Sequence, residues 1–331
     1  MTYIHGLGHF HPENVIDNAF LCDLDIGTDG DWIMERVGIE RRRTVLPLDY
    51  IKTTRNADPR QAIEASLYSN AQTGARAAQR AISAAGLKPD DIGLVISGSC
   101  SPQSSCPAEA CATAAELGID APAFDLNSAC SSLAAQLHFV DSMRPERLPD
   151  FVLVIQNENS TRAIDYNDRN SCVLWGDCTS AQVISPRLPA RLKVTHSQFA
   201  SNPEGCDKVR FVNFGHFTQE GRTVQSFAIR RTLALLAQMR ERLEEARAAA
   251  LKFIGHQANR GMLDNICRSA GISAENHYFN VNEYGNCGAA GAPSVLSQRV
   301  ADLCEGDRVA IAVVGGGLSW GALLLEVGSW A

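Results

Sequence analysis

The sequence predicts an α/β protein made of two duplicated halves, each rich in βαβ units. Three pairs of apolar segments carry this prediction, and the members of each pair are separated by nearly the same number of residues. They are 94–96 with 252–254, 124–127 with 279–282, and 150–155 with 307–314. Because the pairs also follow one another in the same order, a duplication of roughly one domain length explains them.

The repeat divides the chain into residues 1–185 and 186–331, with no Gly/Ser-rich or Pro-rich linker between them. The stretch 186–226 is polar, with several prolines and glycines, so we expect it to be irregular and to cross between the halves. Apolar residues at helical spacing then predict an amphipathic helix over 230–252.

Composition narrows the class of protein. A chain of 331 residues that is 45% hydrophobic can bury a large core. Its net charge of −7 argues against nucleic acid as a partner. The sequence has neither an apolar run of about 18 residues nor a signal peptide. We therefore expect no membrane segment, and we expect a cytoplasmic location. The 11 cysteines lack paired C-x-x-C spacing, which argues against a disulfide framework and against a zinc site.

Cys130 is the first candidate for chemistry. It lies in the run 124–133, where a short apolar strand leads into a helical pattern. Unpaired backbone N–H groups and the helix dipole stabilise a thiolate at the start of a helix, which makes such a cysteine nucleophilic. Taken alone, Cys130 could equally be a small buried apolar residue.

Two later segments favour the catalytic interpretation. His256 follows an apolar strand, and Asn286 precedes a run of small residues that allows close backbone approach. Either residue alone would be an ordinary turn residue. Together with Cys130 they supply a thiol nucleophile, a base and an amide donor at three strand ends. The repeat places Cys130 in one half and the other two residues in the second half, so the site should lie where the halves meet.

Motifs along nearly the whole chain resemble the β-ketoacyl-acyl carrier protein synthase III family of condensing enzymes. The motifs begin at residues 31, 128, 172, 256, 284 and 315 and read DWIMERVGI, SAC, CVLWGD, HQAN, YGN and GGGLSWG. The resemblance implies the thiolase fold, a five-layered α-β-α-β-α sandwich of two similar halves. It also implies a homodimer that acts on acyl-coenzyme A, on acyl carrier protein, or on both, without a metal or a resident cofactor.

The resemblance assigns roles to the candidate residues. Cys130 would carry the acyl group, while His256 and Asn286 would stabilise the enolate formed when a malonyl thioester loses carbon dioxide. The backbone N–H groups of Cys130 and Gly317 would form an oxyanion hole, because the glycines at 315–317 can aim an amide into the site. The product would be a β-ketoacyl thioester.

The resemblance also assigns binding residues. Trp32 and Arg36 would hold the adenine end of coenzyme A by stacking and by charge, and Asn259 would contact the pantetheine arm. Cys106 aligns with a position where the family often has a bulky aromatic residue that closes the acyl pocket of the partner subunit. A smaller residue there predicts a primer longer or bulkier than acetyl.

Departures from the family pattern indicate a specialised branch, such as one in secondary metabolism. The stretch 44–74 is longer than the family's loop and is expected at the surface, where long insertions often bind ligands. Two alternatives stay open: acyl transfer to an oxygen or nitrogen acceptor without decarboxylation, and a non-catalytic partner in a heterodimeric ketosynthase. A degradative thiolase would need a second catalytic cysteine near the carboxyl terminus, where this chain has Leu318 and Ser319.

Overall fold

The protein, seen here as a computed structural model that describes residues 1–329, is organised around a ten-stranded sheet. In spatial order the strands are β12 (His277–Tyr278), β11 (Lys252–Gly255), β13 (Arg308–Gly315), β14 (Ser319–Val327), β8 (Leu192–Ser201), β1 (Thr2–Phe10), β7 (Cys178–Ser185), β6 (Val152–Glu158), β4 (Leu94–Gly98) and β5 (Ala123–Asp125). Two-stranded ribbons are formed by β2 (Asn14–Asp17) with β3 (Arg41–Thr44) and by β9 (Val209–Arg210) with β10 (Thr218–Gln219).

The sheet consists of two halves with the same topology. In the first half β4 runs parallel to β5 and β6, and β6 is antiparallel to β7. In the second half β11 runs parallel to β12 and β13, and β13 is antiparallel to β14. The halves are joined through β1 and β8, which pair at only three residues of each strand. The predicted duplication is therefore confirmed. Segments 94–96 and 252–254 lie in β4 and β11, and 150–155 and 307–314 lead into β6 and β13, whereas 124–127 and 279–282 lie at or just after the ends of β5 and β12 and not within equivalent strands.

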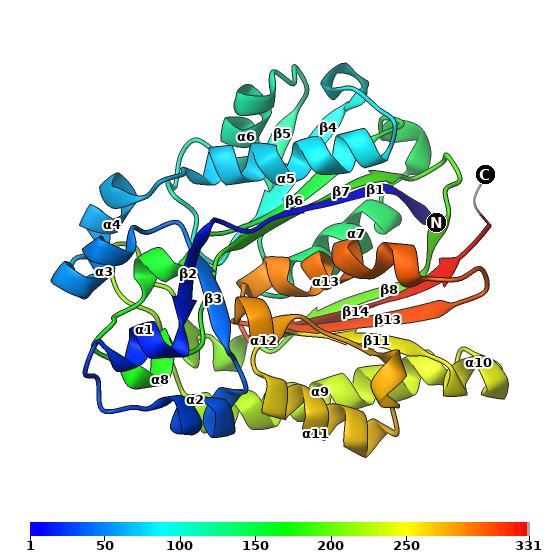
Figure 1. Cartoon of the computed structure of the whole chain (residues 1–331). Coiled ribbons are helices and arrows are strands. Elements are labelled where there is room, and N and C mark those ends of the chain that lie inside the picture. The colour runs from blue at the N-terminus through cyan, green and yellow to red at the C-terminus, as the bar shows by residue number, and fades with distance from the viewer. Residues whose placement is uncertain (330–331) are drawn as a thin grey trace.

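Five layers are visible in Figure 1: α5 and α6, the strands of the first half, α7 and α13, the strands of the second half, and α9 with α11. The helices are α1 (Asn18–Cys22), α2 (Gly30–Val37), α3 (Leu48–Thr54), α4 (Pro59–Ala65), α5 (Asn70–Ala84), α6 (Glu109–Leu117), α7 (Ser132–Ser142), α8 (Arg169–Cys172), α9 (Gly221–Arg240), α10 (Glu245–Ala249), α11 (Arg260–Ala270), α12 (Val281–Tyr284) and α13 (Gly291–Arg299). This is the predicted α-β-α-β-α sandwich.

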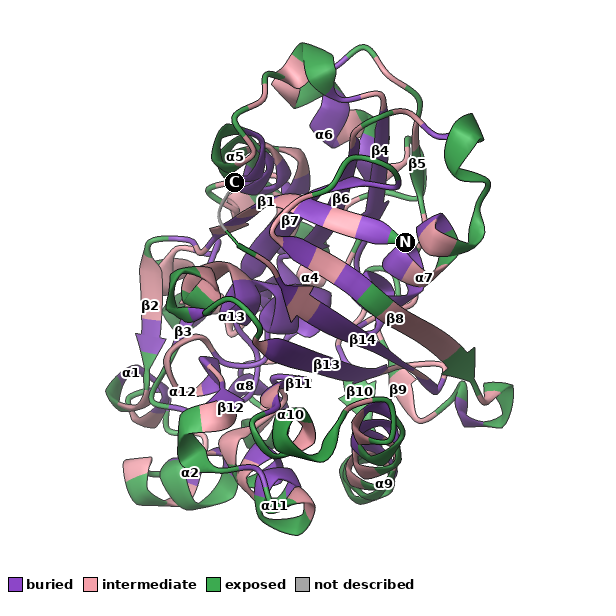
Figure 2. Cartoon of the chain, turned by 90° about the vertical axis from the view of Figure 1, so that its right-hand side faces the viewer, coloured by how far each residue is buried: buried purple, intermediate pink, exposed green. Residues whose placement is uncertain are grey.

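The central layer forms the core between the two halves of the sheet. Leu133 and Leu137 of α7 lie in one buried apolar cluster with Val295 and Leu296 of α13 and with residues from both halves of the sheet. Figure 2 shows the strands buried along most of their length, while the outer helices expose one face. Because α7 and α13 are enclosed by sheet on both sides, the loops that lead into them are held firmly.

Close backbone approach explains the glycines of β1. A Cβ atom at Gly6 or Gly8 would lie about 2 Å from a backbone carbonyl oxygen of α5, at Ala81 and Ala77 respectively. The bare strand therefore lets α5 pack directly on the sheet. The amino terminus of α5 carries a capping box, in which Ser69 and Gln72 bond to each other's backbone.

Three local predictions need correction. The stretch 186–226 is not simply irregular, since it contains β8, a ten-residue strand paired with both β14 and β1. The helix expected over 230–252 is α9, which begins at Gly221 and ends at Arg240. The stretch 44–74 lies largely at the surface, as expected, but it is not a plain loop: it folds into α3 and α4, and its Asn56 is fully buried and donates to the backbone oxygens of Arg162 and Ile164.

The boundary between residues 185 and 186 coincides with the end of β7. That residues 1–185 and 186–331 form two separate domains stays a prediction.

Candidate active site

Cys130 lies in a tight turn between β5 and α7. The turn is closed by Ser131, whose backbone N–H and hydroxyl both donate to the backbone oxygen of Ser128. Ala129 has a left-handed backbone conformation with φ of +47°, which is uncommon for a residue with a side chain and costs free energy. Cys130 is only 7% exposed and lies just before α7, close to the predicted helix start.

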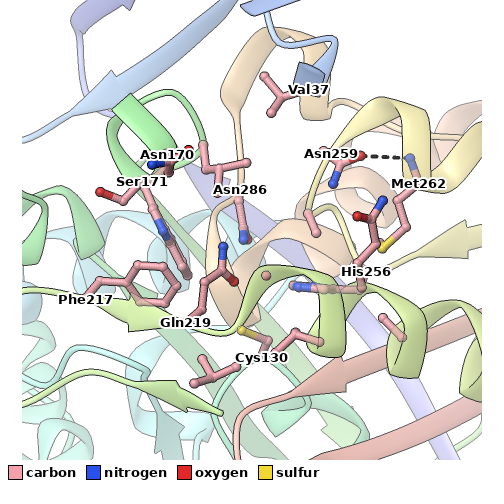
Figure 3. A pocket seen from close by; sticks show the side chains of 18 of the residues that line it. Val37, Cys130, Asn170, Ser171, Phe217, Gln219, His256, Asn259, Met262 and Asn286 are labelled. Carbon is pink, nitrogen blue, oxygen red and sulfur yellow. Dashed lines mark hydrogen bonds between the residues drawn. The ribbon is translucent and has the colours of Figure 1, made fainter. Parts of the chain in front are cut away.

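His256 directly follows β11, as predicted, and is 8% exposed. Asn286 is fixed by three hydrogen bonds. Its backbone N–H donates to Leu174 (2.7 Å), its backbone oxygen accepts from Gly176 (3.1 Å), and its Oδ1 accepts from the backbone N–H of Gly288 (3.0 Å). Because Oδ1 is engaged, the amide presents its Nδ2 N–H groups to the site. Figure 3 shows the Cys130, His256 and Asn286 side chains directed into one space.

That space is a cavity of about 960 Å³. It is lined by all six side chains expected to react or to hold the thioester carrier: Cys130, His256, Asn286, Trp32, Arg36 and Asn259. Gly315, Gly316 and Leu318 also line it, so the glycine turn approaches the site. The oxyanion hole assigned to the N–H groups of Cys130 and Gly317 stays a prediction. Cys106 is exposed and lies outside this lining in the described chain, so its role in an acyl pocket also stays a prediction.

A second cysteine lies beside the nucleophile. The Sγ atom of Cys100, two residues after β4, is 3.5 Å from the Sγ atom of Cys130. The hydrogen bond with Cys100 holds the pKa of Cys130 well below its usual value; burial opposes this, and His256 contributes by hydrogen bonding and by charge. The same hydrogen bond, together with burial, raises the pKa of Cys100 well above its usual value. The Cys100 thiol therefore donates and the Cys130 thiolate accepts.

Glu158, the last residue of β6, supports both sides of the site. Its Oε1 accepts from the backbone N–H groups of Cys100 (2.9 Å) and Ala289 (3.1 Å), so one carboxyl group joins the Cys100 loop to the turn after Asn286. Burial, with a further contribution from the negative charge on Cys130, raises the pKa of Glu158 from 4.5 to about 8. At Gly288, φ is +53° and a Cβ atom would lie 2.7 Å from the Glu158 carboxyl carbon, so only glycine fits there.

The mouth of the cavity is formed in part by α2. The Asp29 carboxylate accepts from the Trp32 backbone N–H (2.8 Å) and caps this helix, which carries Trp32 and Arg36. The Arg169 guanidinium lies over the Trp32 ring at 4.9 Å from its centroid. Beside the end of α2, Asn259 caps α11 by accepting from the Met262 backbone N–H (2.7 Å) (Figure 3). Trp32, Arg36 and Asn259 therefore all lie where α2 and α11 border the cavity.

Three residues of the site were not predicted from the sequence: Cys100, Glu158 and Arg169. The repeat could have identified the first two, because they lie at or just after the ends of β4 and β6, whose counterparts β11 and β13 are followed by His256 and by the glycine turn. Arg169 has no comparable signal, since it is one arginine among many. Within residues 1–329 no cluster of three or more His, Cys, Asp or Glu side chains could hold a metal ion, and no helix is long and apolar enough to span a bilayer.

A thiolase-type duplication with a cysteine, a histidine and an asparagine at its centre defines an acyl-transferring condensing enzyme. Models of 3-oxoacyl-[acyl-carrier-protein] synthase III match residues 124–203, and models of the carboxyl-terminal part of that protein match residues 247–327. The chain is 31% identical to the β-ketoacyl-[acyl-carrier-protein] synthase III of Sphingopyxis alaskensis over 336 residues, which cover 98% of each protein. It belongs to the β-ketoacyl-acyl carrier protein synthase III family.

Solved structures agree with this assignment. The 3-oxoacyl-[acyl-carrier-protein] synthase III of Aquifex aeolicus superposes with a TM-score of 0.86 at 28% identity, covering 98% of this chain and all of that one. The priming β-ketosynthase of the R1128 polyketide pathway shares the fold, with a TM-score of 0.80 at 23% identity over 99% of this chain and 97% of that one.

Proposed function

We propose that the enzyme transfers an acyl group from a thioester to Cys130 and then condenses it with a malonyl thioester, with loss of carbon dioxide. The observation that carries this proposal is the convergence of Cys130, His256 and Asn286 on one cavity, with Asn286 oriented to donate. A thiolate suits acyl transfer, and a pair of donors suits the enolate.

In the first half-reaction the Cys130 thiolate attacks the thioester carbon. The Cys100 thiol stabilises that thiolate by donating to it across 3.5 Å. The negative oxygen of the tetrahedral intermediate would accept from the backbone N–H groups of Cys130 and Gly317. The bond between the acyl carbon and the carrier sulfur then breaks, and the carrier leaves as a thiolate that takes a proton from solvent. The acyl group remains on Cys130 as a thioester.

In the second half-reaction a malonyl thioester occupies the same cavity. Its thioester oxygen would accept hydrogen bonds from His256 and from the Asn286 amide, which lowers the energy of the enolate left when the carboxylate departs as carbon dioxide. The enolate carbon attacks the carbonyl carbon of acyl-Cys130, a carbon–carbon bond forms, and the Cys130 thiolate is released. His256 lines the cavity and contributes by hydrogen bonding and by charge to the lowered pKa of Cys130, so its ring is close enough to the reacting sulfur to serve this step.

Residues at the edge of the cavity suggest how the thioester substrate binds. Trp32 and Arg36 would hold the adenine end of coenzyme A, Arg169 would extend the stacked surface over Trp32, and Asn259 would contact the pantetheine arm. We also propose acyl carrier protein as a partner, a homodimer as the working assembly, and no resident cofactor. A cytoplasmic location fits the cysteines, all 11 of which are free.

A panel of acyl-coenzyme A species would test the proposal. The intact enzyme should gain the mass of one acyl group, on Cys130 alone. Addition of malonyl-coenzyme A or malonyl-carrier protein should then discharge the acyl group, with release of carbon dioxide and a β-ketoacyl product. Discharge to an oxygen or nitrogen acceptor without carbon dioxide would overturn the condensation step, and absence of acylation would overturn the whole proposal.

A further inference from the structure

The active site contains a pair of thiols in place of a single one. The Sγ atoms of Cys100 and Cys130 are 3.5 Å apart, and both residues lie in loops, after β4 and before α7. A disulfide bond requires about 2.05 Å between the sulfur atoms. The gap to be closed is therefore about the length of one covalent bond, which is within the range of side-chain rotation and a small loop shift.

Surrounding contacts indicate which of the two loops is held in place. Gly315 packs on the Cys130 turn so closely that a Cβ atom there would lie 3.0 Å from the backbone nitrogens of Cys130 and Ser131. The Cys100 backbone N–H donates to Glu158 (2.9 Å), and the residue as a whole is less buried than Cys130. Because the Cys130 turn is the more tightly packed of the two, we expect Cys100 to be the residue that moves.

The two thiols also differ in reactivity. Cys130 lines the cavity, so a small solute that enters the cavity reaches it, and its sulfur is the hydrogen-bond acceptor of the pair. A thiolate reacts with peroxides, whereas a protonated thiol does not react readily. Because its pKa is raised, Cys100 stays protonated, and it lies next to the Cys130 sulfur that the peroxide oxidises.

We propose that Cys100 is a resolving thiol, which converts peroxide oxidation of Cys130 into a reversible disulfide. In the first step the Cys130 thiolate attacks one oxygen of hydrogen peroxide, the O–O bond breaks, and Cys130 becomes a sulfenic acid while hydroxide takes up a proton and leaves as water. In the second step the Cys100 sulfur attacks the Cys130 sulfur, the S–O bond breaks, and a second water leaves with the Cys100 proton. Two thiols are oxidised and one peroxide is reduced.

The disulfide has two consequences for the enzyme. It removes the nucleophile, so acyl loading stops while the oxidant is present. It also prevents further oxidation of Cys130 to the sulfinic acid, which an ordinary thiol reductant does not reverse. A dithiol such as dithiothreitol should therefore restore the oxidised enzyme.

The test treats the whole enzyme with hydrogen peroxide and maps the cross-link. Cleavage after lysine and arginine leaves Cys100, Cys106, Cys111 and Cys130 in one peptide. Further cleavage after Glu109 and Glu116 separates Cys130 from a peptide that carries Cys100 and Cys106. We expect those two peptides to stay joined until they are reduced, and the intact protein to lose the mass of two hydrogen atoms.

Two matched serine variants identify the partner thiol. Cys106→Ser lies in the same peptide and should keep the cross-link. Cys100→Ser keeps a hydroxyl that can donate to Cys130 but cannot form a disulfide, so its Cys130 should gain two oxygen atoms and dithiothreitol should restore no activity. Wild-type enzyme should regain nearly all of its activity. Direct oxidation of wild-type Cys130 to the sulfinic acid, or a cross-link that persists in Cys100→Ser, would overturn the proposal. Both outcomes are read by mass, so they do not depend on which acyl substrate the enzyme uses.

Discussion

The two halves of the molecule bring equivalent strand ends to one site and equip them differently. In the first half β4, β5 and β6 lead to Cys100, Cys130 and Glu158; in the second half β11, β12 and β13 lead to His256, Asn286 and the glycine turn at 315–317. The first half supplies sulfur and a carboxyl group, and the second supplies nitrogen and backbone donors. The duplicated backbone therefore fixes the positions, while the chemistry depends on how the side chains diverged.

Replacement of Cys130, the proposed nucleophile of the first half, should have the largest effect on activity. Cys130→Ala should abolish acyl-enzyme formation, because Cys130 alone combines a low-pKa thiol with access to the cavity and to His256. Intact-protein mass after incubation with acyl-coenzyme A measures the step, and circular dichroism checks the fold. The matched control, exposed Cys111→Ala, should acylate normally. Acyl groups mapped to Cys100 or Cys287 instead would contradict the assignment.

The second half should matter mainly in the second half-reaction. Asn286→Asp replaces a donor with a carboxylate that repels the enolate charge, and loss of such a donor costs about 3 kcal/mol, or roughly a hundredfold in rate. Single-turnover measurements should show condensation slowed by that factor or more while acylation of Cys130 changes little. Equal losses in both steps would show that Asn286 serves the whole site.

The sequence predicted those elements of the two halves that are marked by repeated apolar segments. Strands β4, β6, β11 and β13 are nearly fully buried, so their hydrophobic runs were visible. The ten-residue β8 was missed because only Leu192 and Val194 in it are buried, and the strand is held by pairing with neighbours distant in sequence. The start of α9 was missed for a similar reason, since its first turns are polar and its buried face begins at Phe227.

The convergence of Cys130, His256 and Asn286 on one cavity was predictable because each residue follows a recognisable strand or motif. The supporting residues were not, since their roles arise from proximity in the folded chain. Cys100 is one of 11 cysteines until its sulfur is placed 3.5 Å from Cys130, and Glu158 resembles any strand-terminal acid until it is seen to join two backbone segments.

Glu158 should make the stability of the folded protein depend on pH in a way that Glu158→Gln does not. The folded state raises its pKa from 4.5 to about 8, so between these values the folded protein holds a proton that the unfolded chain releases. Stability contributed by this group should therefore fall as pH rises through that window. Glu158→Gln keeps an oxygen for the Cys100 and Ala289 N–H groups, and its melting temperature should decline less between pH 6 and pH 8.

Asp177 provides an internal control for that experiment. Burial raises its pKa from 3.8 to about 6, so it produces a slope of the same sign but only at lower pH. Because Asp177 is unchanged in Glu158→Gln, its slope is common to both proteins, so the curves of wild type and variant should run parallel below about pH 4.5 and separate between pH 4.5 and pH 8. Parallel curves up to pH 8 would show that Glu158 is ionised throughout, with its charge fully balanced by the donors around it.

The smallest effect concerns a loop that is longer in the first half than in the second. Ten residues, 99–108, connect β4 to α6, whereas four residues connect β11 to α11 in the second half. The longer loop carries the exposed Cys106, which we propose reaches the acyl pocket of a second copy. Because cysteine leaves more room there than phenylalanine, each further methylene of the primer should add about 0.8 kcal/mol of binding, or about fourfold, until the pocket is filled.

Acylation rates with acetyl, hexanoyl and octanoyl thioesters would measure that preference. Wild type should favour the longer primers, and Cys106→Phe should shift the preference toward acetyl because the ring occupies the space that the acyl chain would otherwise fill. Cys111→Phe, also at an exposed cysteine of the first half but on α6, should leave the profile as it is. A wild-type preference for acetyl that Cys106→Phe does not alter would mean that the loop does not line the pocket, and that the extra length of the first half serves another contact.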